Sequence, residues 1–400
     1  MPRVLLIVPT GSYRATDFFD AAEALGVEVA VAAEQPLPLV EPELFLTIDC
    51  DHPEDAAKSI VELATRTPID AIVPIDDVGV VIAALAAKEL GLPHNPPEAA
   101  RATRDKALMR ELLSRHEVAQ PGWKVVETPS SGFGPDSTSL AFPLVIKPLT
   151  LAGSKGVIKV DRPEDFASTI ARVEEISGEE RVLLEEFVPG PEVAVEGMVR
   201  KGSLEVLAIF DKPDPLDGPF FEETIYVTPS RLPAPSQQEI ARVTQEAVTA
   251  LGLTEGPVHA ELRLPDPNQA KVIEVAARSI GGICGRALSF GLLDTPLEAL
   301  ILRHALGRSE TSPRRGRASG VMMIPIPAAG TLKQVGGLAE AAAVPGVVDV
   351  EITSAIGTRL RMVPEADVYL GFIFAKGSDP GVVEEALRKA HACLEFEIRG

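Results

Sequence analysis

Two glutamates in the third quarter of the chain are spaced so that they meet across a β-turn. The segments that flank the polar turn 265–270 alternate apolar and polar side chains, which predicts an antiparallel hairpin. A symmetric hairpin places Glu261 opposite Glu274, and Leu262 opposite Ile273. Directly opposed side chains have Cβ atoms about 4.5 to 5.5 Å apart. The two carboxylates are therefore expected to lie side by side.

Two ionised carboxylates at that separation repel each other by roughly 3 kcal/mol at an effective dielectric constant of about 20, so a cation is needed to offset them. A divalent cation fits best, because magnesium takes oxygen ligands and keeps sites for water and substrate phosphates. The alternatives are two solvated glutamates on an exposed face, or a register that slips by one residue. Pro265 and Pro267 leave this choice open, because they make the turn hard to predict.

A lysine stands near the end of an apolar strand, directly before a glycine-rich loop. Residues 142–148 predict a buried strand in which Lys147 needs an anionic partner, unless its ammonium reaches water along the side-chain stem. In the loop 149–156, glycines let backbone N–H groups approach a phosphate. Further donors to a phosphate are expected from Ser154, Lys155 and Gly156.

A second predicted strand, residues 182–186, ends in acidic side chains before a Pro-Gly turn and a further carboxylate. This pattern suits a purine slot. Glu185 and the backbone of residues 186–188 would contact the adenine edge, and Glu192 would accept hydrogen bonds from ribose hydroxyls. Solvated acids at a strand end give the same pattern, so both interpretations stand at this point.

The elements that position these residues begin with alternating strands and helices. Strands are predicted at 3–9, 27–33 and 69–75 and helices at 15–25 and 78–90, which indicates βαβ units and a parallel sheet. The first loop lacks GxGxxG, which disfavours a dinucleotide-binding dehydrogenase. Asp76 and Asp77 follow the third strand, at the sheet edge where ligands often bind.

The rest of the chain is less regular. Residues 99–116 predict one helix, and the polar, basic stretch 308–319 is typical of a linker. Beyond it the pattern mixes strands with a helix near 380–392. Strands are expected there at 320–326, 347–352, 358–363 and 368–375.

Composition narrows the class of protein. The 400 residues carry 38 Lys+Arg against 58 Asp+Glu, a net charge of −20, which argues against binding to nucleic acid or to an anionic membrane. No apolar run approaches the 18 or more residues of a membrane span, and the first strand is too short for a signal sequence. The three cysteines have no paired spacing, so we expect buried thiols in a cytoplasmic protein.

The chemical motifs, taken in order, resemble the ATP-grasp superfamily over residues 1–305. No single motif is specific, whereas eight in this order and at these separations are. They are Asp105-Lys106-x-x-Met109, Val145-Ile146-Lys147-Pro148, the loop 150–156, Glu185-Glu186-Phe187-Val188, Glu192, Glu261, Glu274 and Arg278.

The resemblance implies a role for each motif. Lys106 and Lys147 would hold the phosphates and the adenine side of ATP, and Arg278 would steady an acyl phosphate. Mg²⁺, expected as two ions with Mn²⁺ as a substitute, would bind Glu261 and Glu274. The adenosine would be held by Glu185, Glu186, Phe187, Val188 and Glu192.

One departure and two further likenesses point to a subgroup. Many members have Asn two residues after the second metal glutamate, where this chain has Ala276, so metal coordination must be completed otherwise. The run Glu-x-Ala-Ala-Arg-x-x-Gly at 274–281 and the tail 319–398 resemble the L-amino-acid ligases, which make dipeptides. In that subgroup the region around Glu223 and Tyr226 lines the amino-acid pocket, and Gly281 and Gly282 are expected to wrap the same pocket.

The implied fold is α/β, with an α+β central part, in an ATP-grasp architecture. The expected domains are a Rossmann-like domain at 1–98, an ATP-grasp domain at 99–307 with a mobile lobe at about 140–190, and an α+β domain at 308–400. The expected activity is an ATP- and Mg-dependent ligase that joins two amino acids, with small-molecule substrates and a homodimer as one candidate assembly. The alternatives are a biotin-carboxylase-like or purine-pathway carboxylase that activates bicarbonate, and an inactive nucleotide-binding module.

Overall fold

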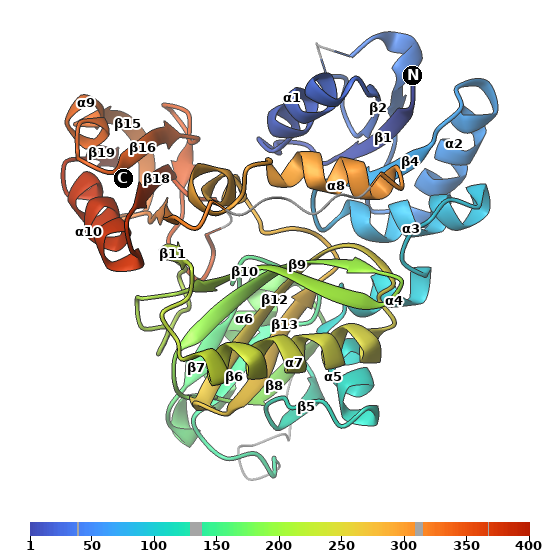
Figure 1. The fold of residues 1–400 in the computed structure, drawn as a ribbon. Coiled ribbons are helices and arrows are strands. Elements are labelled where there is room, and N and C mark those ends of the chain that lie inside the picture. The colour runs from blue at the N-terminus through green and yellow to red at the C-terminus, as the bar shows by residue number, and fades with distance from the viewer. Residues whose placement is uncertain (38–39, 129–137, 309–314, 367) are drawn as a thin grey trace.

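A computed structural model describes residues 1–37, 40–128, 138–308, 315–366 and 368–400. Half of the linker predicted at 308–319, residues 309–314, lies outside the described residues. Figure 1 shows the amino-terminal strands and helices in blue, a green and yellow central region below them, and the carboxy-terminal region in orange and red beside both. The mixed α/β architecture predicted from the sequence is confirmed.

The amino-terminal region is a four-stranded parallel sheet in the order β3-β2-β1-β4. Its helices end at Gly26 and Gly91, which adopt the left-handed backbone that glycine accommodates without strain. The predicted strands and helices are confirmed, and β3 and α2 are additional. The elements are β1 Arg3–Val8, α1 Ala15–Leu25, β2 Glu28–Ala33, β3 Phe45–Thr47, α2 Pro53–Arg66, β4 Ala71–Pro74 and α3 Gly79–Leu90.

The helix predicted at 99–116 is wrong as a single element, because it is broken into α4 (Pro97–Ala102) and α5 (Lys106–Arg115). Asp105 has an extended backbone, and its carboxylate accepts hydrogen bonds from the N–H groups of Ala107 and Leu108 at 2.8 and 3.1 Å. This is an N-cap, which starts a new helix. The break places Arg104 in the gap and Lys106 at the first position of α5.

A separate four-stranded sheet, in the order β5-β8-β6-β7, forms the lobe that carries the glycine-rich loop. The strands on either side of that loop, β6 and β7, pair antiparallel and form a hairpin. β5 belongs to this sheet although it precedes the predicted lobe at 140–190. The elements are β5 Trp123–Glu127, β6 Leu144–Pro148, β7 Ile158–Val160, α6 Phe166–Ser177 and β8 Arg181–Glu186.

An eight-stranded sheet, in the order β13-β12-β9-β10-β11-β14-β18-β16, joins the central and carboxy-terminal regions. The join is the antiparallel pairing of β11 with β14, which crosses the predicted boundary at residue 307, so the domain division stays a prediction. The elements are β9 Glu192–Arg200, β10 Ser203–Asp211, β11 Ile225–Thr228, α7 Ala234–Leu251, β12 Glu255–Asp266, β13 Gln269–Ala276, β14 Ala318–Ile324, β16 Val347–Ile352 and β18 Gly371–Gly377.

The carboxy-terminal region adds a small sheet in the order β17-β15-β19, of which the sequence indicated only β17. The remaining elements are α8 Leu297–Ala305, β15 Gly330–Gly336, α9 Leu338–Ala342, β17 Arg359–Leu360, α10 Pro380–His391 and β19 Glu395–Arg399. Within the described ranges, none of the helices is both long and apolar enough to span a lipid bilayer. Cys284 is buried, whereas Cys50 and Cys393 are half-buried, which corrects the expectation of three buried thiols.

The junction between β11 and β14 gives a stability prediction. A Cβ atom on Gly320 would lie 2.7 Å from the carbonyl oxygen of Tyr226 in β11, so Gly320→Ala must push the two strands apart. We expect a loss of about 1 to 3 kcal/mol in the free energy of unfolding, measured by chemical denaturation. Gly336→Ala is the control, because its Cβ would meet other atoms only at 3.6 Å or more. Equal stability of the two variants would contradict the prediction.

Candidate functional site

The two glutamates singled out in the sequence face each other across the β12–β13 hairpin. Glu261 pairs with Glu274, which confirms that part of the predicted register. The pairing of Leu262 with Ile273 is wrong, because a register shift after Glu261 places Leu262 opposite Val272. The physical reason is that the backbone N–H of Val272 donates to the carbonyl of Ala119 at 2.9 Å, outside the hairpin. The hairpin is therefore asymmetric, yet the two carboxylates still meet.

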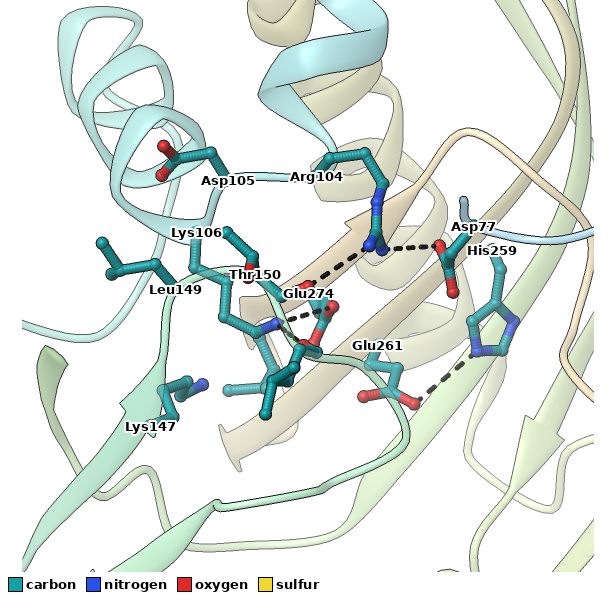
Figure 2. A network of polar contacts seen from close by, with 12 residues as sticks. Asp77, Arg104, Asp105, Lys106, Lys147, Leu149, Thr150, His259, Glu261 and Glu274 are labelled. Carbon is teal, nitrogen blue, oxygen red and sulfur yellow. Dashed lines mark hydrogen bonds and ion pairs between the residues drawn. The ribbon is translucent and has the colours of Figure 1, made fainter. Parts of the chain in front are cut away.

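Cationic side chains of the chain itself offset both carboxylates. The ammonium of Lys106 lies 3.3 Å from Glu274 Oε1, as Figure 2 shows. Glu261 Oε1 lies 3.0 Å from the ammonium of Lys212 and 3.6 Å from Nε2 of His259. Sequence reasoning assigned no role to Lys212 or His259. These side chains supply positive charge beside both carboxylates, and the metal role of Glu261 and Glu274 stays a prediction.

Lys212 lies at the centre of an acidic cluster formed by Glu192, Glu223 and Glu261. Each of the three glutamates offers an oxygen, and these oxygens lie within 4.8 Å of one another. The buried ammonium of Lys212 donates to all three, including Glu192 at 2.7 Å, and lies 5.1 Å from the centre of the Tyr226 ring. Burial lowers the pKa of Lys212, but the three carboxylates outweigh it and raise that pKa well above its ordinary value.

The partners of Lys212 differ in charge state. Burial raises the pKa of Glu223 to about 7, because the attraction of Lys212 offsets it only in part and Glu261 adds repulsion. The carboxyl group of Glu223, the residue expected to bind a substrate ammonium group, therefore gains and loses its proton near neutral pH. The sequence held a signal for Lys212, because it follows the apolar strand β10 much as Lys147 ends β6.

His259 is a buried cation that lies next to the carboxylate of Glu261. Its Nδ1 lies 2.5 Å from Oε1 of Glu196, a carboxylate that is fully buried. Burial lowers the pKa of His259, but hydrogen bonds and attraction to Glu196 and Glu261 reverse this and raise the pKa to about 9. A protonated His259 donates one N–H to Glu196 and holds positive charge beside Glu261.

Lys147 is held by an ion triad at the end of β6. Its ammonium lies 2.6 Å from Glu185 Oε2, and Nε of Arg110 donates to Glu185 Oε1 at 2.5 Å. All three side chains are buried, so each cation depends on the shared carboxylate. Burial raises the pKa of Glu185, but Arg110 and Lys147 outweigh it and hold that pKa at about 2.

The triad gives Glu185 a task that the sequence did not indicate. Both of its oxygens are engaged by cations, so its carboxylate fixes the ammonium of Lys147, and a contact with adenine stays a prediction. Arg110 was missed, although it lies one helical turn after Lys106. Its guanidinium also donates to the carbonyls of Val272 and Ile273 at 3.0 and 2.6 Å, which ties α5 to β13.

The segment expected to bind adenine is framed by two further cations. Arg263 donates to the carbonyl of Val188 at 2.8 Å and lies 2.9 Å from Glu192 Oε2. The Phe187 ring lies 4.8 Å from the Arg263 guanidinium and 4.5 Å from the Lys159 ammonium. The carboxylate of Glu186 accepts a hydrogen bond from the N–H of Ala141 at 3.0 Å. These contacts fix the strand end while leaving Phe187 and Val188 on the wall of a cavity.

Arg278 is oriented by a carboxylate from the amino-terminal region. Its guanidinium lies 2.8 Å from Asp77 Oδ2 and donates to the carbonyl of Ser279 at 3.0 Å. The other carboxylate oxygen of Asp77 lies 3.2 Å from Arg104. Burial raises the pKa of Asp77, but Arg278 and Arg104 outweigh it and lower that pKa below its ordinary value. Within the described part of the chain, the buried Nε of Arg278 has no hydrogen-bond partner.

A cavity of ≈350 Å³ joins these groups and is lined by residues from all three regions of the chain. Lys155 and Gly156 are not in its lining, and the N–H of Gly156 instead donates to the carbonyl of Pro364 at 2.8 Å. Tyr13, Cys284, Met323, Tyr369 and Phe372 also line the cavity, and the rings of Tyr13 and Tyr369 both contact the ring of Phe372. The predicted site residues in the lining are Lys106, Lys147, Ser154, Glu185, Glu186, Phe187, Val188, Glu192, Glu223, Tyr226, Glu261, Glu274, Arg278, Gly281 and Gly282.

Comparison with protein families assigns three consecutive parts of the chain. Residues 19–94 match the ATP-grasp N-terminal domain, residues 140–287 the ATP-grasp domain, and residues 322–399 the L-amino acid ligase C-terminal domain 2. The chain is a member of the ATP-grasp superfamily. The ATP-grasp match contains strands β6, β7 and β8 of the lobe, the Lys147–Glu185 pair and the β12–β13 hairpin, so it covers most of the site described above.

Two relatives place this ATP-grasp protein near the amino-acid ligases. It is 29% identical over 256 residues to the alanine–anticapsin ligase of Bacillus amyloliquefaciens, covering 58% of this chain and 53% of that protein. The chain thus spans about half the length of this and two other curated alanine–anticapsin ligases that it matches. The L-amino acid ligase of Bacillus licheniformis superposes over 100% of this chain and 99% of its own, with a TM-score of 0.85 and 25% identity.

A more distant neighbour shares the fold alone. The biotin carboxylase domain of the Hydrogenobacter thermophilus 2-oxoglutarate carboxylase, solved with MgADP, ADP and bicarbonate, has a TM-score of 0.71 and 17% identity. The superposition covers 99% of this chain and 90% of that one. The ATP-grasp architecture expected from the sequence is therefore confirmed.

The buried triad of the ATP-grasp core gives a pH-dependent prediction. Glu185→Gln leaves Arg110 and Lys147 without their anion, so we expect a loss of about 3 kcal/mol in the free energy of unfolding at neutral pH. The folded pKa of about 2 lies below the ordinary 4.5, so the contribution of Glu185 is complete above pH 4.5 and is lost as the pH falls toward 2. The measured difference between wild type and variant should shrink over that range.

Urea unfolding at several pH values tests this. Glu246→Gln is the matched control, because Glu246 also pairs with an arginine but at an exposed helix surface. Its effect should stay within about 0.5 kcal/mol. A Glu185→Gln variant as stable as this control at neutral pH would show that the triad contributes nothing.

Proposed function

We propose that this ATP-grasp protein is an ATP- and magnesium-dependent carboxylate–amine ligase that joins two amino acids into a dipeptide and releases ADP and phosphate. One observation carries the proposal. A single cavity is lined both by lysines and glutamates of the ATP-grasp core and by Tyr369 and Phe372. These two aromatic residues come from the region matched to L-amino acid ligases.

The cations of the cavity suit the phosphates of ATP. Lys147 is fixed by Glu185, so its ammonium is positioned before the nucleotide arrives, and such preorganisation is the main contribution that a protein makes to phosphoryl transfer. Lys106 lies at the start of α5 with Glu274 beside it. The adenine would lie against Phe187 and Val188, with Glu192 near the ribose hydroxyls.

The paired carboxylates fit magnesium. Glu261 and Glu274 present oxygen donors from opposed positions of two strands, which is the ligand type that magnesium prefers. Ala276 adds no side-chain ligand, so water and the ATP phosphates would complete the coordination. When bound, magnesium would neutralise the charge of the β- and γ-phosphate oxygens. Binding would also displace the ammonium of Lys106 or Lys212 from these carboxylates, since both already contact cations.

The reaction follows from the poor reactivity of a carboxylate as an acyl donor. The γ-phosphoryl group passes to the carboxylate of the first amino acid and gives an acyl phosphate and ADP. An amine then attacks the acyl carbon, and phosphate leaves as the amide forms. Arg278 is placed to contact the acyl phosphate and the tetrahedral oxyanion, because Asp77 holds its guanidinium at the cavity wall.

Two features of the cavity suit an amino acid as the first substrate. Glu223, with its pKa raised to about 7, gains a favourable partner when a substrate ammonium group lies beside it. A Cβ atom on Gly281 would meet no other atom within 4 Å, so this glycine leaves open space in the cavity for a side chain, whereas Gly282 packs closely against Phe372. The identity of both amino acids is to be found by screening pairs for ADP and phosphate release, with mass spectrometry of the products.

The neighbour solved with MgADP and bicarbonate supplies a second candidate function. Because it shares only the fold, bicarbonate activation is the less favoured proposal, and ADP release that needs bicarbonate but no amino acid would support it. An inactive nucleotide-binding module would bind ATP without turnover across the whole amino-acid panel. The homodimer and the cytoplasmic location stay predictions.

The paired glutamates give the first activity prediction. Glu274→Gln removes the charge that a metal ion requires while keeping the shape of the side chain, so we expect ADP formation to fall at least about a thousandfold. Asp266→Asn is the control, because this exposed carboxylate lies at the tip of the same hairpin. ADP release is measured with a coupled assay on the best amino-acid pair. Near-normal turnover in Glu274→Gln would exclude the metal role.

Removal of divalent cations gives a second prediction. Chelation should abolish ADP formation, and Mg²⁺ or Mn²⁺ should restore it, because both are bound by carboxylate and phosphate oxygens. Mn²⁺ binding, followed by electron paramagnetic resonance in the presence of ADP, should weaken in Glu274→Gln and not in Asp266→Asn. Activity that persists in excess chelator would contradict magnesium dependence.

A further inference from the structure

We propose that Arg104 and Asp77 are positioning residues that link the docked state of the glycine-rich loop, residues 149–156, to the orientation of Arg278. The inference rests on the proposed function, because it assigns Arg278 to the acyl phosphate. It concerns two residues to which the sequence motifs gave no such role. Their contacts run from the loop through Arg104 and Asp77 to the guanidinium of Arg278, and Figure 2 shows the contact between Arg104 and Asp77.

Two cations hold consecutive main-chain carbonyls of the loop. A guanidinium N–H of Arg104 donates to the carbonyl of Thr150 at 3.2 Å, and the ammonium of Lys106 donates to that of Leu151 at 2.6 Å. Arg104 lies in the short break between α4 and α5 that Asp105 creates by capping α5, and Lys106 is the first residue of α5. Because the acceptors are backbone atoms, these bonds form only when the loop lies against the break.

Each cation has a carboxylate of the reaction centre as its second partner. Arg104 lies 3.2 Å from Asp77 Oδ1, and Lys106 lies 3.3 Å from Glu274 Oε1. Asp77 uses its other oxygen, Oδ2, to hold Arg278 at 2.8 Å. One carboxylate thus divides its two oxygens between the arginine that holds the loop and the arginine assigned to the acyl phosphate.

This division makes the two arginines interdependent. The side chain of Asp77 is 12% exposed, so an oxygen abandoned by Arg104 has little water to replace the lost partner. The guanidinium of Arg278 can then turn toward both oxygens of Asp77, in the bidentate geometry that arginine favours, and away from the cavity. A docked loop therefore keeps Arg278 directed at the substrate, and an undocked loop releases it.

The docked loop also affects how water reaches the cavity. The loop begins on Glu179, whose carboxylate accepts from the N–H groups of Leu149 and Thr150, and it ends at the bond between Gly156 and the carbonyl of Pro364. Arg104 and Lys106 hold the segment between these anchors. A loop docked in this way covers the cavity while Arg278 is in position, which restricts hydrolysis of the acyl phosphate.

Limited proteolysis of the intact chain tests the loop contact directly. Trypsin cuts after Lys155, inside the loop, and mass spectrometry follows that cut separately from others. Arg104→Ala should raise the rate of this cleavage about fivefold, which corresponds to loss of one hydrogen bond to a partly exposed carbonyl. Arg101→Ala is the matched control, because Arg101 lies one turn earlier, is exposed and pairs with Glu54 outside the site. In the Arg101→Ala variant, trypsin should cut after Lys155 at the wild-type rate.

The coupling to Arg278 needs a second readout. In the proposed reaction, Arg104→Ala should form less dipeptide per ADP released than wild type, with the KM for ATP nearly unchanged. Compared with Arg104→Ala, Arg104→Lys should restore part of the protection of the loop against trypsin. It should not restore the wild-type ratio of dipeptide to ADP, because an ammonium group lacks the forked donors of a guanidinium. Asp77→Asn should lower the ratio as well, while its loop stays better protected than in Arg104→Ala.

The outcomes are distinguishable. Cleavage after Lys155 that is equally fast in Arg104→Ala and Arg101→Ala overturns the inference. Faster cleavage with an unchanged ratio of dipeptide to ADP overturns the link to Arg278. If wild type forms no dipeptide from any pair while Arg104→Ala is still cut faster, the loop contact is supported and the amino-acid ligase proposal fails.

Discussion

Every functional element of this structure depends on one constraint, which is that a charge removed from water must meet an opposite charge. The ammonium of Lys147 can lie at the end of a buried strand because it pairs with the carboxylate of Glu185. That carboxylate can itself be buried because it also pairs with the guanidinium of Arg110. The same rule places Lys212 among three glutamates and His259 against Glu196. The cavity is thus lined by charges that the protein has already paired. Under the proposed function, a substrate would enter by exchanging partners with these charges, and the site would need little rearrangement to accept phosphates and a cation.

The constraint also decides what the sequence could predict. The opposition of Glu261 and Glu274 followed from local spacing, because both lie on one hairpin, and the lysine at the end of β6 followed from its apolar strand. Arg110, Lys212 and Asp77 acquire their partners across 75, 49 and 201 residues, in the pairs with Glu185, Glu261 and Arg278. No local pattern encodes such distances. The charge of each residue indicates that it needs an oppositely charged partner if it is buried, but only the fold shows which residue that partner is.

Two of the errors of local reasoning, in a helix and in a strand register, have equally physical causes. The helix predicted at 99–116 fits the apolar periodicity, yet the side chain of Asp105 satisfies two backbone N–H groups and starts a new helix. The register beyond Glu261 fails because Val272 bonds to Ala119 instead of β12. In both cases a contact from outside the periodic pattern decided the outcome. The break at Asp105 is also where Arg104 and Lys106 reach the loop, so the irregular point is the one that serves the site.

The continuity of the eight-stranded sheet has a consequence for how this architecture can be recombined. β11 finds its second neighbour in β14, a strand that lies about ninety residues later and belongs to the region matched to L-amino acid ligases. A chimaera that exchanges this region must also supply a strand of matching register, or β11 is left as an open edge that invites association with other chains. Grafts made at the linker alone would cut through a shared sheet. A successful exchange has to treat β11 and β14 as one inherited unit.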